Sequence, residues 1–356
     1  SKVGSRSLLF FGVPCQGLHD QHRHGNVLFG LYAMHIAASA HEADLMFVCH
    51  EKNDYDNLFW WMQSLPYTIY LKRDLLAQAQ QRVQPPPSRS STCAGMGKIP
   101  LQYASDLVTY DLRRMALNIA GPRTSEMKQY ASENPELTIP KHSKKQDRLP
   151  SKPIHSKMEL DSVAIHFRCG DLLGNLNSEM NENYGLMPFY VYTSLLTKKD
   201  TTIGIVTTPF DPDYLRKQDV HHGPQCQELV ELFRDYVQEH APWAKVSIRN
   251  DPTETIPMVL SRLILADRKS ICIRSTFCVF PTLASFAQQR IFLEGGVSYF
   301  ISNISDPGVI RLEQAHTPYI YSHEIHQLGW NDTIQWLLHD EHWHTQQRGK
   351  KEKEYR

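Results

Sequence analysis

Between residues 163 and 293, short runs of β-branched and other apolar residues alternate with longer amphipathic segments. Helices are expected at residues 226–240, 254–266 and 276–288, where apolar residues recur at the helical period. Strands and helices that alternate in this way predict a parallel, doubly wound α/β sheet, which binds ligands at the carboxyl ends of its strands. The strands are expected at Val163–Phe167, Thr202–Thr207, Val246–Arg249, Ser270–Ile273 and Arg290–Leu293.

The N-terminal half is less regular but has the same ingredients. Strands are expected at Leu8–Val13, Leu45–Cys49 and Tyr67–Leu71, and a helix at Asn26–His41, so a second α/β layer is predicted. Residues 121–157 are polar and rich in proline, as in a linker or surface excursion. The expected domains are therefore residues 1–120, a linker at 121–157, a nucleotide-binding type of domain at 158–345 and a charged tail at 346–356.

The charge balance excludes some partners. The 356 residues contain 38 basic and 38 acidic side chains, so no excess charge indicates nucleic acid or an anionic membrane as a partner. The longest apolar runs are far shorter than the ~20 residues that a membrane-spanning helix needs. We expect no nucleic acid and no membrane contact from this segment.

Cysteines and glycosylation sequons bear on the compartment. The seven cysteines include no C-x-x-C pair, which argues against a zinc ribbon or a thioredoxin-type site and is compatible with three disulfides plus one thiol. N-x-S/T triplets begin at Asn303 and Asn331, and the chain begins at Ser1, compatible with removal of a signal or anchor. We expect a protein of the secretory pathway, in the Golgi or endoplasmic reticulum lumen.

An H-x-R-x-G-D motif begins near the end of the strand expected at Val163–Phe167. It comprises His166, Arg168 and Asp171, with Gly170 permitting close backbone approach. The planar guanidinium offers paired donors to phosphate and stays charged at any working pH. The motif predicts a phosphate site at the strand end; a surface Arg–Asp pair on a turn is the structural alternative.

Two further motifs stand at predicted helix starts. Ser275, Thr276 and Phe277 follow a strand, with Asp267 three residues before that strand. Hydroxyl groups, free backbone N–H groups and a helix dipole together bind anions, although ordinary helix capping needs the same residues. Near the N-terminus, Gly25 and Asn26 form a turn that opens a helix.

The order and spacing of these three motifs resemble those of the superfamily of GDP-fucose-dependent fucosyltransferases, which includes α1,2, α1,6 and protein O-fucosyltransferases. The resemblance implies an inverting glycosyltransferase with a GT-B-like fold, in which two Rossmann-like domains face each other across a cleft. It implies GDP-fucose as donor, a glycan or glycoprotein as acceptor, and no metal or other cofactor. The chain departs from the usual pattern at Cys169, where α1,2 and α1,6 enzymes have a second arginine, and at His24 before the glycine.

The resemblance also implies roles for individual residues. Arg168 would bind the β-phosphate, and His166 and Asp171 would support its loop. Asp267 would read the guanine or ribose, and the residues at 275–277 the pyrophosphate. From the opposite, acceptor-side domain, residues 1–120, the donor would be closed in by Gly25 and Asn26.

The catalytic base is expected to be His24. Displacement at the anomeric carbon requires the acceptor hydroxyl to lose a proton, and histidine titrates near neutral pH. His24 directly precedes the Gly25–Asn26 turn, which the resemblance places at the cleft. Acidic rivals are Asp20, Glu179 and Glu182.

Other classes of function remain open from the residues alone. Asp-x-Asp pairs at residues 54–56 and 211–213 are typical of metal-dependent glycosyltransferases that use another nucleotide sugar. Histidines in H-x-x-H-x-H spacing at residues 19–24 and 339–344 have ligand types that suit zinc. A non-catalytic protein that binds sugar nucleotides or glycans would use the same arginine.

Overall fold

The computed structural model describes the part of the chain made up of residues 10–14, 44–48, 67–70, 101–134, 158–169, 172–173, 184–207, 210, 223–254, 256–273, 275–293, 306–313 and 316–346. The chain divides into two compact units, Ser1–Met115 and Ala116–Arg356. The division falls inside helix α6 (Leu101–Ala120), near the expected end of the first domain.

The first unit contains a parallel sheet of three strands in the order β1-β2-β3. These strands confirm the three that the sequence predicted in this half. The expected helix at residues 26–41 lies outside the described residues. The strands are β1 (Phe10–Pro14), β2 (Asp44–Val48) and β3 (Tyr67–Tyr70).

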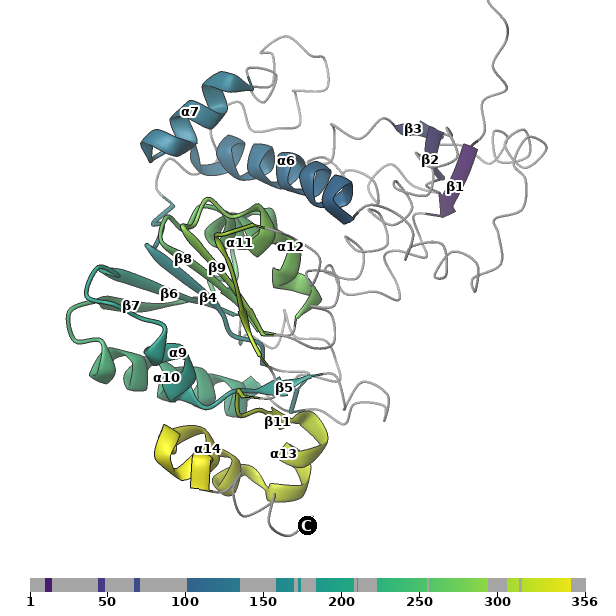
Figure 1. The fold of residues 1–356 in the computed structure, drawn as a ribbon. Helices are drawn as coiled ribbons and strands as arrows, with labels where there is room; N and C mark the ends of the chain where they lie inside the picture. Colours follow the sequence, from purple (N-terminus) through teal and green to yellow (C-terminus); the bar gives the residue numbers. More distant parts are fainter. Residues whose placement is uncertain are drawn as a thin grey trace, which may run out of the picture. The chain divides into compact units, whose positions relative to one another are not determined.

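The second unit is built on a six-stranded sheet in the order β10-β9-β8-β4-β6-β7, and all neighbouring strands are parallel (Figure 1). The chain begins with β4 in the middle of the sheet and adds β6 and β7 on one side. It then returns to the other side of β4 and adds β8, β9 and β10, as in a Rossmann-type sheet. All predicted strands are confirmed; β10 was not predicted. The strands are β4 (Val163–His166), β6 (Thr202–Val206), β7 (Lys245–Arg249), β8 (Lys269–Cys272), β9 (Gln289–Leu293) and β10 (Val309–Leu312).

Helices cover both faces of this sheet (Figure 1). On one face lie α9 (Phe189–Ser194) and α10 (Gly223–His240), and on the other α11 (Ile256–Ile264) and α12 (Thr276–Ala284). Helix α12 ends before the predicted residue 288, at Ser285, whose backbone is no longer helical and whose hydroxyl donates to the Leu263 carbonyl at 2.8 Å. A small antiparallel pair and two helices complete the unit: β5 (Gly185–Leu186), β11 (Ile320–Tyr321), α13 (Ser322–Leu328) and α14 (Trp330–Leu338).

The core explains how the central strand positions its side chains. Val163 and Ile165 of β4, with Phe167, belong to the cluster that includes α10, and the rings of Phe167 and Phe233 stack at 4.7 Å between centroids. Side chains alternate along a strand, so Ala164 and His166 face the opposite layer. Every residue of β4 is buried, as expected for a parallel sheet with both faces covered.

Part of the expected linker is helical. Helix α7 (Ser125–Glu133) begins after Thr124, whose hydroxyl accepts a hydrogen bond from the Met127 N–H at 3.2 Å. Met127 is fully buried, which ties this polar helix to the unit. Residues 135–157 and the tail beyond residue 346 lie outside the described part.

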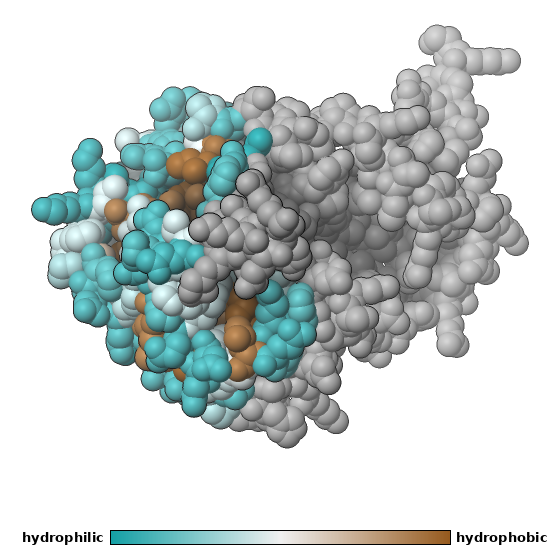
Figure 2. All heavy atoms as spheres, turned by 60° about the horizontal axis from the view of Figure 1, so that its bottom comes forward, coloured by the Kyte–Doolittle hydropathy of each residue, from teal (hydrophilic) through white to brown (hydrophobic). Residues whose placement is uncertain are grey.

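The described surface is mostly hydrophilic on the side that Figure 2 shows, with separate apolar patches among polar residues. Among the described residues, Trp243 and Leu328 are the exposed large apolar side chains. Within the described ranges, the structure holds no helix that combines the length and the apolar character needed to cross a bilayer.

Candidate functional site

The candidate site lies where β4 and β8 end side by side. His166, the last residue of β4, is paired in register with Cys272, the last residue of β8. From these two strands the chain proceeds outward in opposite directions, so their carboxyl ends form the topological switch point, where sheets of this kind bind ligands. The two motifs that the sequence singled out in this half directly follow these two strands. The structure therefore brings them to one edge.

Arg168 is held against an aromatic ring. Its guanidinium carbon lies 3.7 Å from the centroid of the Tyr184 ring, a cation–π arrangement. The Tyr184 carbonyl accepts a hydrogen bond from the Ser322 N–H at 2.9 Å. At Gly185, the next residue, a Cβ would lie 2.0 Å from the Ile320 carbonyl oxygen, so glycine permits the β5–β11 pairing that fixes this segment. Sequence reasoning missed this partner, because the contact depends on β5.

The loop that carries Arg168 is anchored on several sides. Cys169 forms a disulfide with Cys226 in α10. Leu172 and Leu173 are buried, and the Ser322 hydroxyl donates to the Leu172 carbonyl at 2.7 Å. These anchors hold the backbone in place and restrict the positions that the guanidinium can reach. Such preorganisation favours binding, because less freedom is lost when a ligand arrives.

His166 is a neutral, buried ring. It stacks on Phe277 with 5.4 Å between ring centroids, which joins the strand-end motif to the start of α12. Burial, and then the nearby charge of Arg168, lower the pKa of His166 to about 3. Its Nδ1 atom is buried and finds no hydrogen-bond partner among the described residues. His166 thus supports the site by packing, and its expected support of the Arg168 loop involves no hydrogen bond between described residues.

The turn from β8 into α12 presents Ser275 at the N-cap position. Ser275 has an extended backbone and is 3% exposed, but its hydroxyl makes no capping hydrogen bond. Its carbonyl accepts from the backbone N–H groups of Cys278 and Val279. Cys278 forms a disulfide with Cys272, so a covalent link encloses the turn. Ser275 therefore does not cap helix α12 with its side chain.

Thr207 adds a polar group that sequence reasoning missed. It directly follows β6, the neighbour of β4, and within the described part of the chain its buried hydroxyl has no hydrogen-bond partner. Buried polar atoms without partners are rare in folded proteins. Thr207 and His166 each place one such polar atom at the carboxyl edge of the sheet. Its position at the end of the strand next to β4 was the signal that could have identified Thr207.

Asp267 does not belong to this group. It precedes β8, whose first residue, Lys269, pairs with Val163, the first residue of β4. Asp267 is exposed at the amino edge of the sheet, and the length of β8 separates it from Ser275, at ~3.3 Å per residue. The role expected for Asp267 beside Arg168 is therefore corrected: the two residues stand at opposite edges.

Other predicted site residues lie outside the described part of the chain. They are His24, Gly25, Asn26, Asp171 and the side chain of Thr276, together with the rival bases Asp20, Glu179 and Glu182 and both Asp-x-Asp pairs.

The C-terminal histidines form an aromatic cluster. His344 is buried, with its Nε2 3.1 Å from the Trp336 carbonyl oxygen, and His339 stacks on Trp343 at 4.1 Å between centroids. His342 instead pairs with Gln346 at 2.7 Å. No group of three possible metal ligands occurs among the described residues. His339 and His344 therefore pack against tryptophans, whereas His342 is exposed.

The low pKa of His166 predicts a pH-dependent stability. Below the unfolded-state pKa of about 6.5, the unfolded chain takes up a proton that the folded chain does not, so stability falls as pH falls toward 3. The expected loss between pH 6.5 and 5 is about 2 kcal/mol. Urea unfolding of His166→Phe, which keeps a ring against Phe277, should show a flatter pH profile. Exposed His326, changed in the same way, is the control; equal profiles for both variants would contradict the prediction.

Comparison with known proteins adds no family. No protein-family model matches the chain, and no curated protein sequence matches it. The fold and the site define an α/β protein with a parallel, Rossmann-like six-stranded sheet and polar groups gathered at its switch point.

Proposed function

We propose that the protein is an inverting glycosyltransferase that transfers fucose from GDP-fucose to a hydroxyl of a glycan or glycoprotein. The observation that carries the proposal is the meeting of Arg168 and the 275–277 turn at one switch point, as a nucleotide diphosphate requires. The proposal includes a GT-B-like arrangement, with the acceptor bound on the side of residues 1–120.

In the proposed reaction, the acceptor oxygen attacks the anomeric carbon as the bond from that carbon to the β-phosphate oxygen breaks. GDP leaves with the electron pair, and Arg168 stabilises the charge that develops on its phosphate by paired hydrogen bonds. The N-terminal end of α12 contributes N–H groups and its dipole to the same anion. Because a fixed cation and a helix terminus supply this charge, the proposed mechanism needs no metal.

The acceptor's proton goes to His24 in this proposal, and Gly25 and Asn26 approach the donor from the acceptor side. His166 stays neutral because of its low pKa, so it does not add a positive charge beside Arg168. Two disulfides close to the site are compatible with an oxidising compartment, which supports the proposed location in the secretory pathway.

Nucleotide binding tests the proposal directly. GDP and GDP-fucose, but not UDP- or CMP-sugars, are expected to raise the unfolding temperature in the presence of EDTA. A ligand at a hundred times its Kd stabilises the native state by about 2.7 kcal/mol. Asp267→Asn is expected to retain this response, because Asp267 lies at the other edge of the sheet.

Three outcomes would count against parts of the proposal. Selective stabilisation by UDP would overturn the donor. Loss of binding in EDTA, with rescue by manganese, would favour the metal-dependent class. Binding of GDP-fucose without transfer to any offered glycan or glycoprotein would favour a non-catalytic binding protein.

A further inference from the structure

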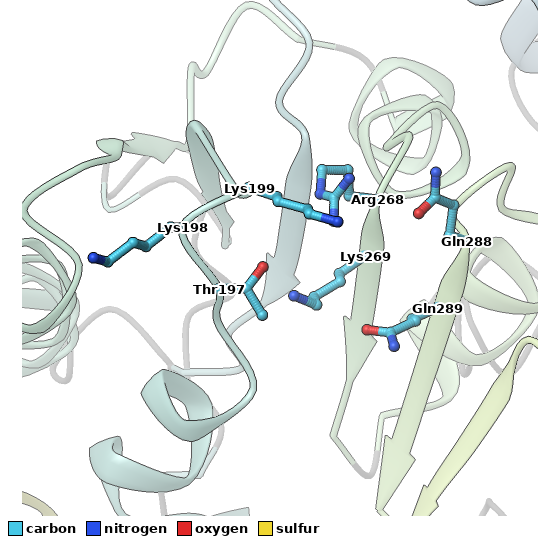
Figure 3. Close-up of a pocket in the computed structure, with 7 residues that line it drawn as sticks. All are labelled: Thr197, Lys198, Lys199, Arg268, Lys269, Gln288 and Gln289. Atoms are coloured by element: carbon cyan, nitrogen blue, oxygen red, sulfur yellow. The ribbon is translucent and has the colours of Figure 1, made fainter.

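A pocket lies at the amino edge of the six-stranded sheet, opposite the switch point. It has a volume of about 380 Å³, at the lower end of the ~300–1,000 Å³ typical of small-molecule sites. The loop before β6 and the starts of β8 and β9 form it, as Figure 3 shows. It is lined by Thr197, Lys198, Lys199, Arg268, Lys269, Gln288 and Gln289.

A buried carboxylate organises the cations of this pocket. Asp200 is completely buried and accepts hydrogen bonds from Arg268 Nε at 2.9 Å and from the Lys269 ammonium. It also accepts from the backbone N–H and the hydroxyl of Thr197, at 2.7 and 3.0 Å. Arg268 and Lys269 are therefore fixed in position, rather than being freely rotating surface side chains.

The pocket retains an excess of positive charge. Four basic side chains line it, and among the described residues Asp200 is the carboxylate that pairs with two of them, while the exposed Asp267 precedes Arg268 in the chain. The Lys199 side chain extends toward Arg268, whereas Lys198 points away from the other labelled residues (Figure 3). Arg268 has a side chain that is 25% exposed, so its guanidinium remains accessible beside the Lys199 ammonium.

An exposed aromatic side chain contacts Thr197, one of the residues that line the pocket. Trp243 is 39% exposed, and its indole N–H donates to the Thr197 carbonyl at 2.9 Å. An exposed tryptophan with its N–H already satisfied offers an apolar face to a ligand. Gln288 and Gln289 add amide groups that donate to and accept from hydroxyls.

We propose that this pocket binds a sulfate or phosphate group carried on a sugar, with the anion between Lys199 and Arg268 and the sugar ring near Trp243. Guanidinium and ammonium groups together suit a tetrahedral oxyanion, and amides and an indole suit a sugar. The site is separate from the switch point and does not rest on the proposed transferase activity.

Calorimetric titration at constant ionic strength tests the proposal on the whole protein. The probes are inorganic sulfate, inorganic phosphate, galactose 6-sulfate, galactose 6-phosphate and unmodified galactose. The two sugar esters are expected to bind more tightly than the free anions, and galactose not to bind. Lys199→Glu should weaken the binding of the esters by about tenfold to a hundredfold, the range for a lost charge-assisted hydrogen bond.

Matched variants make the outcome decisive. Lys128→Glu, which changes an exposed lysine of α7 outside the pocket, should alter affinity less than twofold at the same net charge. Trp243→Ala should remove the preference for sugar esters and leave binding of the free anions. Asp267→Asn, which removes a neighbouring negative charge, should tighten the binding of the anions. Equal affinities for free and sugar-borne anions, equal effects of the two lysine variants, or no binding of any anion would each overturn the proposal.

Discussion

Replacing Arg168 with alanine is expected to abolish measurable transfer from GDP-fucose and to leave the protein folded. Arg168 follows the buried strand β4. When its guanidinium is removed, the loop is still held by the Cys169–Cys226 disulfide and by the two buried leucines. Removing one preorganised donor from a developing oxyanion costs about 10²–10³ in turnover, and a bidentate arginine supplies two donors. Steady-state transfer and GDP titration, with thermal unfolding as the check on folding, measure the effect.

Arg168→Lys should give an intermediate loss, because lysine keeps the charge but lacks the planar fork. The matched control is Arg234→Ala on α10, where an exposed arginine pairs with the adjacent Asp235 at 2.7 Å. That variant should retain nearly full activity. Turnover near that of the unmodified protein in Arg168→Ala would mean that Arg168 takes no part in transfer.

Replacing Asp200 with asparagine is expected to destabilise the fold by about 3–5 kcal/mol, the usual cost of breaking a buried ion pair from one side. The change leaves the Lys269 ammonium, whose side chain is 4% exposed, without its carboxylate. Urea unfolding at pH 7 measures the effect. Asp235→Asn, in an exposed pair, is the control and should cost less than about 1 kcal/mol.

The pH dependence of the pair has a defined sign. Burial opposes ionisation of Asp200, but hydrogen bonds from Lys269, then Arg268 and Thr197, outweigh it and lower its pKa below 3.8. The stability that this ionised carboxylate contributes is present above pH 3.8 and is lost as pH falls through the lowered pKa. The double variant Asp200→Asn with Lys269→Met, which removes both charges, should recover most of the lost stability. If Asp200→Asn alone lowers the free energy of unfolding by less than about 1 kcal/mol, the Lys269 ammonium is hydrated in the variant and the ion pair does not stabilise the fold.

The pattern of the sequence predicted the second unit well. Parallel strands buried on both faces read as apolar runs, and β4 begins with such a run, whereas β8 begins with the buried polar residues Lys269 and Ser270. Their positions were sufficient to predict that Arg168 and Ser275 follow strand ends. That the two ends are adjacent required the strand order, which hydrogen bonding between strands sets and local pattern does not.

The residues that were missed or misplaced share one cause. The contact of Tyr184 with Arg168 depends on β5 pairing with β11, whose residues are far away in the sequence. The unpartnered hydroxyl of Thr207 is a property of packing, not of composition. Asp267 was grouped with Ser275 because they are close in sequence, yet the strand between them carries the chain from one edge of the sheet to the other.

The two disulfides near the switch point differ in what they do to the unfolded chain. Cys169 and Cys226 are 57 residues apart, whereas Cys272 and Cys278 are 6 residues apart. In a chain-entropy model, closing the longer loop removes unfolded-state entropy worth about 4 kcal/mol, and the shorter loop about 2 kcal/mol. The long link therefore acts mainly on the ensemble of unfolded conformations and joins two distant elements. The short link restricts that ensemble less, and its main consequence is local, since it ties the last residue of β8 to the first turn of α12 on either side of Ser275.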